Sequence, residues 1–154
     1  MASTAPVAVV IMAAGKGTRM RSAVPKVLHT IGGRSLLDHA VAAARGLRPD
    51  HLVVVVRHER DAVVAHLSEV APDAVAADQD ETPGTGRAVA CGLASLPEDL
   101  AGPVVVTSGD VPLLDTATLR ALLAQHVERG DAVTLLTTVL DDPTGYGRVV
   151  READ

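Results

Sequence analysis

The stretch Val7-Ala-Val-Val-Ile-Met12, followed directly by Ala13-Ala-Gly-Lys-Gly-Thr-Arg-Met-Arg21, decides the fold of this chain. Its six apolar residues show no polar alternation, which is typical of a strand buried on both faces of a sheet. Two alanines and two glycines follow, and there the backbone can approach a ligand closely. Lys16, Arg19 and Arg21 lie in the same loop. A buried strand that ends in such a loop is typical of a phosphate-binding site.

The rest of the chain alternates apolar runs with amphipathic segments. Further strands are expected at residues 51–56, 73–77, 103–110 and 133–140, with a last short strand after residue 147. Helices are expected at residues 36–47, 61–70 and 84–96, and between Asp115 as a cap and Gly130 as a stop. Ser35 and Asp38 have the spacing of a capping box for the first helix. Strands that alternate with helices predict a three-layer α/β fold around a mostly parallel, Rossmann-like sheet.

Composition narrows the class of ligand. The chain has 154 residues, no Phe or Trp, one Tyr and a formal net charge of −5. These features argue against a nucleic-acid partner, which needs aromatic stacking surfaces or a basic face. The lone Cys91 excludes an internal disulfide and fits a reducing compartment, and no apolar run is long enough to span a membrane. We therefore expect a cytoplasmic protein without a membrane partner.

Ligands of parallel sheets bind beyond the carboxyl ends of the strands. The opening loop, the polar loop that begins at Gln79 and the strand that ends at Asp110 all fall at that edge. Two common glycine-loop motifs do not fit. A dinucleotide fingerprint needs a glycine where this chain has Met20, and the Walker loop needs a Gly-Lys-Ser/Thr that Gly15-Lys-Gly-Thr18 does not supply.

Each site residue also has a purely structural interpretation. The basic opening loop fits a solvated turn, and Asp110 fits a turn residue before Pro112. Gln79 fits a solvent-facing loop residue, and Asp141-Asp142 fits a turn better than an acid–base pair. The six histidines show no paired metal-ligand spacing. Only a longer pattern decides between these interpretations and a functional site.

That longer pattern exists. Ala13-Ala-Gly-x-Gly-Thr-Arg-Met20 followed by Pro25-Lys26 resembles the signature of the sugar nucleotidyltransferases. Three further motifs make the chain similar to the uridyltransferase half of the GlmU family, the bifunctional N-acetylglucosamine-1-phosphate uridyltransferases/glucosamine-1-phosphate acetyltransferases: Gln79 with Gly84-Thr-Gly86, Ser108-Gly-Asp-Val-Pro-Leu113, and Asp141-Asp-Pro-Thr-Gly-Tyr-Gly-Arg148. The likeness covers roughly residues 7–152.

The resemblance implies transfer of a uridylyl group from UTP to N-acetylglucosamine 1-phosphate. The products are pyrophosphate and UDP-N-acetylglucosamine, a precursor of the cell envelope. It implies Arg19 and Lys26 as catalytic residues and Asp110 as a ligand of Mg²⁺. It further implies a set of substrate-binding residues: Met12, Ala13, Ala14, Gly15, Lys16, Lys26, Gln79, Gly84, Thr85, Ser108, Gly109, Asp110 and Gly147. Gln79 and nearby backbone groups would pair with uracil, and the Gly147 backbone would face the N-acetyl sugar.

Two features depart from the family pattern. The family often has His where this chain has Arg87. Its remaining sugar-binding residues, a second magnesium ligand and the acetyltransferase half with its β-helix, through which the family trimerises, are expected beyond Asp154. We therefore expect residues 1–154 to form a nucleotidyltransferase domain that is incomplete at its C-terminus and transfers essentially nothing alone. Two alternatives stay open: another nucleotidyltransferase, such as a molybdopterin guanylyltransferase or cytidylyltransferase, and a catalytically silent nucleotide-binding fragment.

Overall fold

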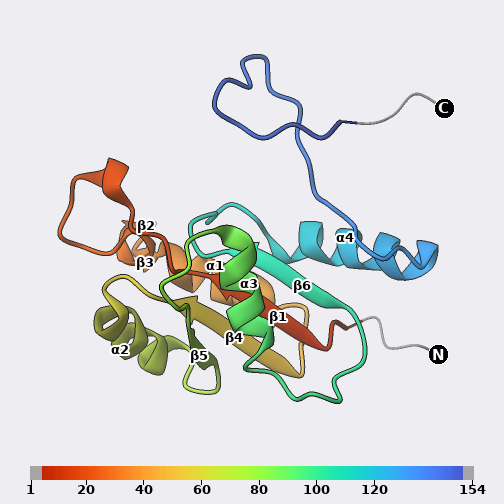
Figure 1. Cartoon of the computed structure of the whole chain (residues 1–154), viewed down its shortest axis with the longest axis horizontal. Coiled ribbons are helices and arrows are strands. Elements are labelled where there is room, and N and C mark those ends of the chain that lie inside the picture. Colours follow the sequence, from red (N-terminus) through yellow and green to blue (C-terminus); the bar gives the residue numbers. More distant parts are fainter. Residues whose placement is uncertain (1–4, 151–154) are drawn as a thin grey trace.

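The computed structural model describes residues 5–150 and is built on a four-stranded parallel sheet (Figure 1). The strands lie in the order β5–β4–β1–β6, with bounds Val75–Asp78, His51–Val56, Ala8–Met12 and Val104–Ser108. In the register of the sheet, Val10 lies between Val53 of β4 and Val106 of β6. The predicted opening strand is therefore a central strand, as its continuous apolar run requires.

Helices cover both faces of this sheet. They are α1 (Leu36–Arg45), α2 (Arg60–Val70), α3 (Thr85–Leu93) and α4 (Thr116–Arg129). Val9 and Ile11 of β1 pack with α1, α2 and α4 in one core cluster, whereas Val10 packs with α3 in a second cluster. Successive residues of a strand point to opposite faces, so β1, which is buried from Ala8 to Ile11, needs apolar side chains on both faces. The predicted three-layer α/β architecture is confirmed.

Side-chain caps set the bounds of two helices. The Ser35 hydroxyl accepts a hydrogen bond from the backbone of Asp38, and the Asp38 carboxylate accepts one from the backbone of Ser35, which confirms the capping box. Asp115 caps α4 by accepting from the backbone N–H of Thr118 at 2.8 Å. Gly130 ends the same helix in the left-handed conformation, as predicted.

Gly92 allows α3 to lie close to the sheet. A Cβ at this position would lie 2.7 Å from Cγ1 of Val10 and 2.8 Å from Cγ2 of Val55. Both distances are shorter than real carbon contacts, so a side chain there would push α3 away from the sheet. Because α3 starts at the loop that follows β5, this close packing also fixes the carboxyl edge of the sheet.

Part of the prediction was wrong. Residues 133–140 form no strand, and neither do residues 148–150; the remainder of the expected last strand lies outside the described residues. Figure 1 shows this part of the chain leaving α4 and extending away from the sheet. Val133 and Val139 are 73% and 98% exposed. A strand needs a neighbouring strand that pairs with its backbone N–H and C=O groups. An apolar run favours burial of the side chains but does not supply that neighbour.

Four short elements had no sequence signal. They are two single-turn 3₁₀ helices, η1 (Thr18–Met20) and η2 (Lys26–Leu28), and an antiparallel pair, β2 (Thr30–Ile31) with β3 (Arg34–Ser35). Elements of two or three residues are too short for a periodicity to show. Across residues 5–150, none of the helices combines the length and the apolar character that a membrane span requires.

Candidate nucleotide-binding site

The carboxyl ends of β1, β4, β5 and β6 meet at one edge of the sheet, and the residues that follow them remain hydrogen-bonded to it. The backbone N–H of Ala13 donates to the carbonyl of Val55 at 2.8 Å, and that of Gln79 donates to the carbonyl of Val56 at 2.9 Å. The first residue of each of these two loops is therefore held in place by the sheet in the same way as the strand before it.

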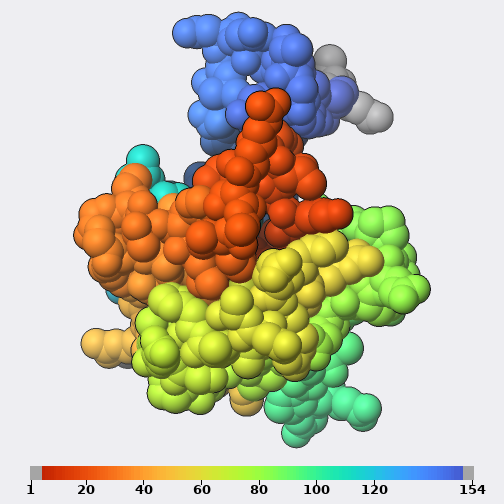
Figure 2. All heavy atoms as spheres, turned by 90° about the vertical axis from the view of Figure 1, so that its left-hand side faces the viewer, coloured from red at the N-terminus to blue at the C-terminus, as the bar shows by residue number. Residues whose placement is uncertain are grey.

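A cavity of about 380 Å³ opens at this edge. Figure 2 views the edge directly, where the red opening loop, the yellow segment after β4 and the green loop before α3 come together. The cavity is lined by residues from five parts of the chain: Met12, Ala13, Ala14, Gly15, Lys16, Lys26, Val27, Arg57, His58, Gln79, Pro83, Gly84, Thr85, Ala88, Ser108 and Asp110.

Lys26 and Asp110 form an ion pair in this cavity, although 84 positions separate them in the sequence. The second oxygen of Asp110 accepts a hydrogen bond from the Ser108 hydroxyl at 2.5 Å. Burial alone would raise the pKa of Asp110, but the hydrogen bonds from Lys26 and Ser108 and the charge of Lys26 outweigh it and lower the pKa below its usual range. Asp110 is therefore a carboxylate at neutral pH.

Neighbouring residues bring Lys26 to this position. Pro25 precedes the η2 turn, and its carbonyl accepts from the backbone of Leu28 at 2.9 Å. Val27, the next residue along the turn, is 6% exposed and belongs to the core cluster with α1. With Val27 anchored in the core, the side chain of Lys26 is left at the cavity.

Gln79 uses its amide to organise its own loop. The side-chain nitrogen Nε2 donates to the carbonyl of Thr82 at 2.9 Å and to that of Gly84 at 3.3 Å. Gly84 has a φ of 116°, a conformation open to glycine and strained for other residues. The turn before α3 thus depends on Gly84, and the side chain of Gln79 closes it.

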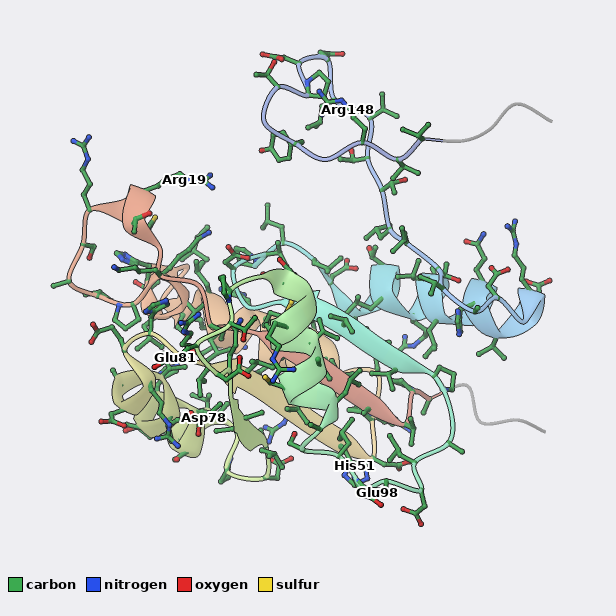
Figure 3. All side chains as sticks on the ribbon, in the orientation of Figure 1. Arg19, His51, Asp78, Glu81, Glu98 and Arg148 are labelled. Carbon is green, nitrogen blue, oxygen red and sulfur yellow. The ribbon has the colours of Figure 1, made fainter. Side chains whose placement is uncertain are left out.

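Eleven of the predicted substrate-binding residues line the cavity, and three predicted site residues do not. Gly109 is absent from the lining, and its backbone N–H donates to the carbonyl of the lining residue Met12 at 2.9 Å. Figure 3 shows Arg19 at the exposed tip of the opening loop. Gly147 borders a different cavity, formed within residues 137–149.

Sequence reasoning missed five residues that line the cavity: Val27, Arg57, His58, Pro83 and Ala88. A usable signal existed for two of them. Arg57 and His58 directly follow the second buried strand, in the same relation that Ala13 and Gln79 have to theirs. The other three face the cavity because of loop paths, which no local pattern encodes.

The residues present fit a divalent cation only with help from a ligand. Within residues 5–150, no group of three or more His, Cys, Asp or Glu side chains is placed to hold a metal ion. Among these residues Asp110 is the one carboxylate that lines the cavity, with the Ser108 hydroxyl beside it. Mg²⁺ is often held by one or two carboxylates, with phosphate oxygens and water completing its shell. Asp110 fits that arrangement once a phosphate is bound.

A parallel sheet with helices on both faces, and a glycine-rich, lysine-bearing cavity at its carboxyl edge, defines a nucleotide-binding α/β domain. The comparisons with known proteins are more specific. Residues 9–152 match the family described as the MobA-like NTP transferase domain, and the chain belongs to this family.

The curated relatives confirm the predicted resemblance to the GlmU family. The bifunctional protein GlmU of Micrococcus luteus is 60% identical over 157 aligned residues, which cover 99% of this chain and 32% of that protein. The bifunctional protein GlmU of Kineococcus radiotolerans is 59% identical over 147 residues, covering 96% and 30%. This chain spans about a third of the length of these relatives.

Solved structures support the same fold. A nucleotidyl transferase from Methanothermobacter thermautotroptrophicus superposes with a TM-score of 0.66 at 26% sequence identity, covering 77% of this chain and 57% of that one. The predicted fold type, the nucleotide-sugar transferase version of the α/β sheet, is thereby confirmed.

Proposed function

We propose that this chain carries the uridylyl-transfer site of a GlmU-type enzyme, which joins UTP and N-acetylglucosamine 1-phosphate to give UDP-N-acetylglucosamine and pyrophosphate. The observation that carries the proposal is the cavity at the sheet edge. It brings together the glycine loop, the Gln79 turn and the Lys26–Asp110 pair, three motifs that lie far apart in the sequence. The high identity to bifunctional GlmU proteins supports this function over other nucleotidyl transfers.

The reaction needs alignment and charge neutralisation rather than a protein nucleophile. An oxygen of the sugar phosphate attacks the α-phosphorus of UTP, the new P–O bond forms, and the bond to the departing pyrophosphate breaks. Ser108 is not activated as a nucleophile, because its hydroxyl donates to a carboxylate whose pKa is lowered and which is therefore a weak base. Within the cavity, the cationic side chains are the groups suited to the task.

Lys26 and Lys16 both line the cavity and would neutralise phosphate oxygens. The ammonium group of Lys26 is paired with the carboxylate of Asp110. Phosphate oxygens of the bound nucleotide would replace that carboxylate as its partner. Arg19 would help to hold the departing pyrophosphate through its fork of donors. Since Arg19 lies on η1 outside the cavity, this role requires the opening loop to move inward.

Asp110 is the residue that would hold Mg²⁺, with Ser108 orienting its second oxygen. The ion supplies neutralisation of the negative charge on the reacting phosphates. This assignment agrees with the hard-oxygen chemistry of the donor and with the location of Asp110 at a strand end.

Gln79 would select the base. Both hydrogens of its amide face backbone carbonyls, so the side-chain oxygen is the group left for a ligand. Uracil carries an N3–H donor that such an oxygen accepts, whereas cytosine has an acceptor at N3. Backbone groups of Ala13, Gly15 and Gly84 would complete the pocket for the base.

Gly147, the residue expected to contact the sugar, does not line the nucleotide cavity. By resemblance the Gly147 backbone would face the N-acetyl group, but residues 137–149 border their own cavity. We propose that this segment must fold over the nucleotide before the sugar phosphate is held. The acetyltransferase activity of the bifunctional relatives is not assigned to this chain.

A pyrophosphate-release assay tests the proposal. The chain is incubated with Mg²⁺, N-acetylglucosamine 1-phosphate and each of UTP, CTP, GTP and ATP, with binding of each nucleotide measured in parallel. We expect UTP to bind most tightly and to give the most release, at a very low rate because the Gly147 segment lies away from the nucleotide cavity. Faster release with GTP or CTP would favour another nucleotidyltransferase. Tight UTP binding without release, by this chain and by the complete nucleotidyltransferase domain alike, would favour a silent nucleotide-binding fragment.

A further inference from the structure

The loop at residues 79–84, which joins β5 to α3, is fastened by arginines from other elements. Arg60 of α2 donates to both carboxylate oxygens of Asp78, at 2.6 and 3.3 Å, where the loop begins. Arg57, directly after β4, donates to the carbonyl of Glu81 at 3.0 Å. Figure 3 labels Asp78 and Glu81 on this side of the molecule, next to α2. One side of the loop is thus tied to the sheet and to α2.

Arg87 fastens the other side. From the first turn of α3, its Nε donates to Oδ2 of Asp80 at 2.9 Å, and its Nη2 donates to the same oxygen. The second oxygen of Asp80 accepts from the backbone N–H of Thr82 at 3.0 Å. These hydrogen bonds, with that from Arg87 as the largest cause, lower the pKa of Asp80 to about 2. The carboxylate therefore stays charged and bonded throughout the neutral range.

This chain of contacts ends at the amide of Gln79. Its Nε2 donates to the carbonyls of Thr82 and Gly84. A carbonyl can only accept, so the amide nitrogen must face the loop. The remaining group, Oε1, has no hydrogen-bond partner among residues 5–150. Gln79 lines the nucleotide cavity, and the only function that it can still offer a base is an acceptor.

We infer that Arg87 is a specificity-determining positioning residue that fixes the orientation of the Gln79 amide. Arg87 does not line the cavity; it binds Asp80, Asp80 accepts from the backbone N–H of Thr82, and the carbonyl of Thr82 accepts from Gln79. With the amide fixed, the cavity favours a base with a donor at N3, as in uracil, over a base with an acceptor there, as in cytosine. This inference rests on the proposed function and adds the device by which the two pyrimidines are told apart.

The exposed position of the pair makes the inference testable without loss of the fold. The Arg87 and Asp80 side chains are 47% and 44% exposed, and exposed ion pairs contribute little to global stability. Arg45 and Asp73 form a comparable exposed pair between α1 and the start of the β5 segment, away from the cavity. Replacing Arg45 therefore removes an ion pair of the same kind and supplies a matched control.

The experiment measures the dissociation constants of UTP and CTP, each with Mg²⁺, by calorimetry for the wild-type chain, Arg87→Ala, Arg87→Lys and Arg45→Ala. We expect Arg87→Ala to lower the preference for UTP over CTP by roughly fivefold, about the effect of one hydrogen bond. Arg87→Lys should keep part of the preference, and Arg45→Ala all of it.

An unchanged preference in Arg87→Ala would overturn the inference while leaving the proposed function in place. An equal loss in Arg45→Ala would also overturn it, because the effect would then be one of general stability. A wild-type chain that prefers CTP or GTP would instead overturn the proposed function, and this inference with it.

Discussion

Both carboxylate oxygens of Asp110 accept hydrogen bonds, one from Lys26 and the other from Ser108. The charges of the Lys26–Asp110 pair balance each other, whereas Lys16 and Arg57 leave the cavity cationic before a ligand arrives. A metal ion that enters competes with Lys26 for Asp110, and the phosphates of a nucleotide compete with Asp110 for Lys26. The same two residues thus exchange partners when UTP and its metal bind together.

Asp110→Asn should remove most turnover by the complete nucleotidyltransferase domain while the fold persists. The variant loses the charged ligand, and several kcal/mol of transition-state stabilisation is expected to disappear, which corresponds to a fall of 10²-fold or more in rate. Pyrophosphate release at saturating UTP and Mg²⁺ measures the effect, and circular dichroism checks the fold. Near-normal release by this variant would contradict the assignment of the metal ligand.

Lys26→Ala should change two affinities in opposite directions. UTP should bind roughly 10- to 100-fold more weakly, since a charge-assisted hydrogen bond of about 1.5–3 kcal/mol is lost. Mn²⁺ alone should bind more tightly, because the lysine no longer neutralises Asp110. Electron paramagnetic resonance of Mn²⁺ and calorimetry of UTP report the two effects separately. Arg129→Ala, on the last turn of α4, should change neither, and a parallel change of both affinities in Lys26→Ala would refute the exchange of partners.

At the scale of elements, the capping box of α1 contributes both to stability and to helix packing. Ser35 is 3% exposed, and its hydroxyl lies 2.9 Å from Nε2 of His66 on α2. Asp38 accepts from the same ring nitrogen at 2.7 Å. The N-terminus of α1 is therefore joined to α2 by the residues that also cap it.

Ser35→Ala should lower the free energy of unfolding by about 1–2 kcal/mol, the cost of a lost N-cap together with its contact to His66. Ser68→Ala is the matched control, because Ser68 is an exposed residue of α2 whose hydroxyl, among residues 5–150, bonds only to the carbonyl of Val64 in its own helix. That control should change stability by less than about 0.5 kcal/mol. Urea denaturation gives both values, and equal effects of the two substitutions would show that the cap is unimportant.

The elements that could be predicted are those whose ends are determined locally. Unpaired backbone groups at the helix ends are satisfied by residues close in sequence: Ser35 with Asp38 at α1, and Asp115 and Gly130 at α4. A local sequence pattern therefore predicts these ends. The strand expected at residues 133–140 depended on a neighbour elsewhere in the fold. Its apolar residues were read correctly, but no pattern within the segment reveals whether a partner edge is available.

For the whole molecule, the same distinction explains which site residues were predictable. Strand ends meet at one edge by topology, so Ala13, Gln79 and Ser108 could be placed together from their positions after apolar runs. Arg19 and Gly147 depend on the paths of longer loops, and their roles stay predictions. Arg57 and His58 were missed although the strand-end rule applies to them equally.

The response of the fold to acid should follow from its lowered carboxyl pKa values. Burial acts to raise the pKa of Asp38, but the hydrogen bonds from His66 and Ser35 outweigh it and lower the pKa. A carboxyl whose pKa is lower in the folded chain binds fewer protons there than when unfolded. Its contribution to stability is therefore complete above about pH 4 and is lost as the pH falls through the folded value.

Asp38→Asn should consequently lower stability at pH 7 and reduce its loss between pH 4 and pH 2. Urea midpoints across this range for the variant and the wild type measure the difference. The exposed Asp50→Asn serves as the control and should follow the wild-type curve. The same acid dependence in Asp38→Asn as in the wild type would contradict the role given to the contact with His66.

Binding of UTP in the sheet-edge cavity can be followed residue by residue. The ¹⁵N-labelled chain is titrated with UTP and Mg²⁺ while the backbone amide signals are recorded. We expect the largest shifts at residues 12–16, 79–88 and 108–110, and smaller shifts with GTP at the same concentration. Shifts centred on residues 132–135 or 137–149, or an equal response to GTP, would contradict this expectation.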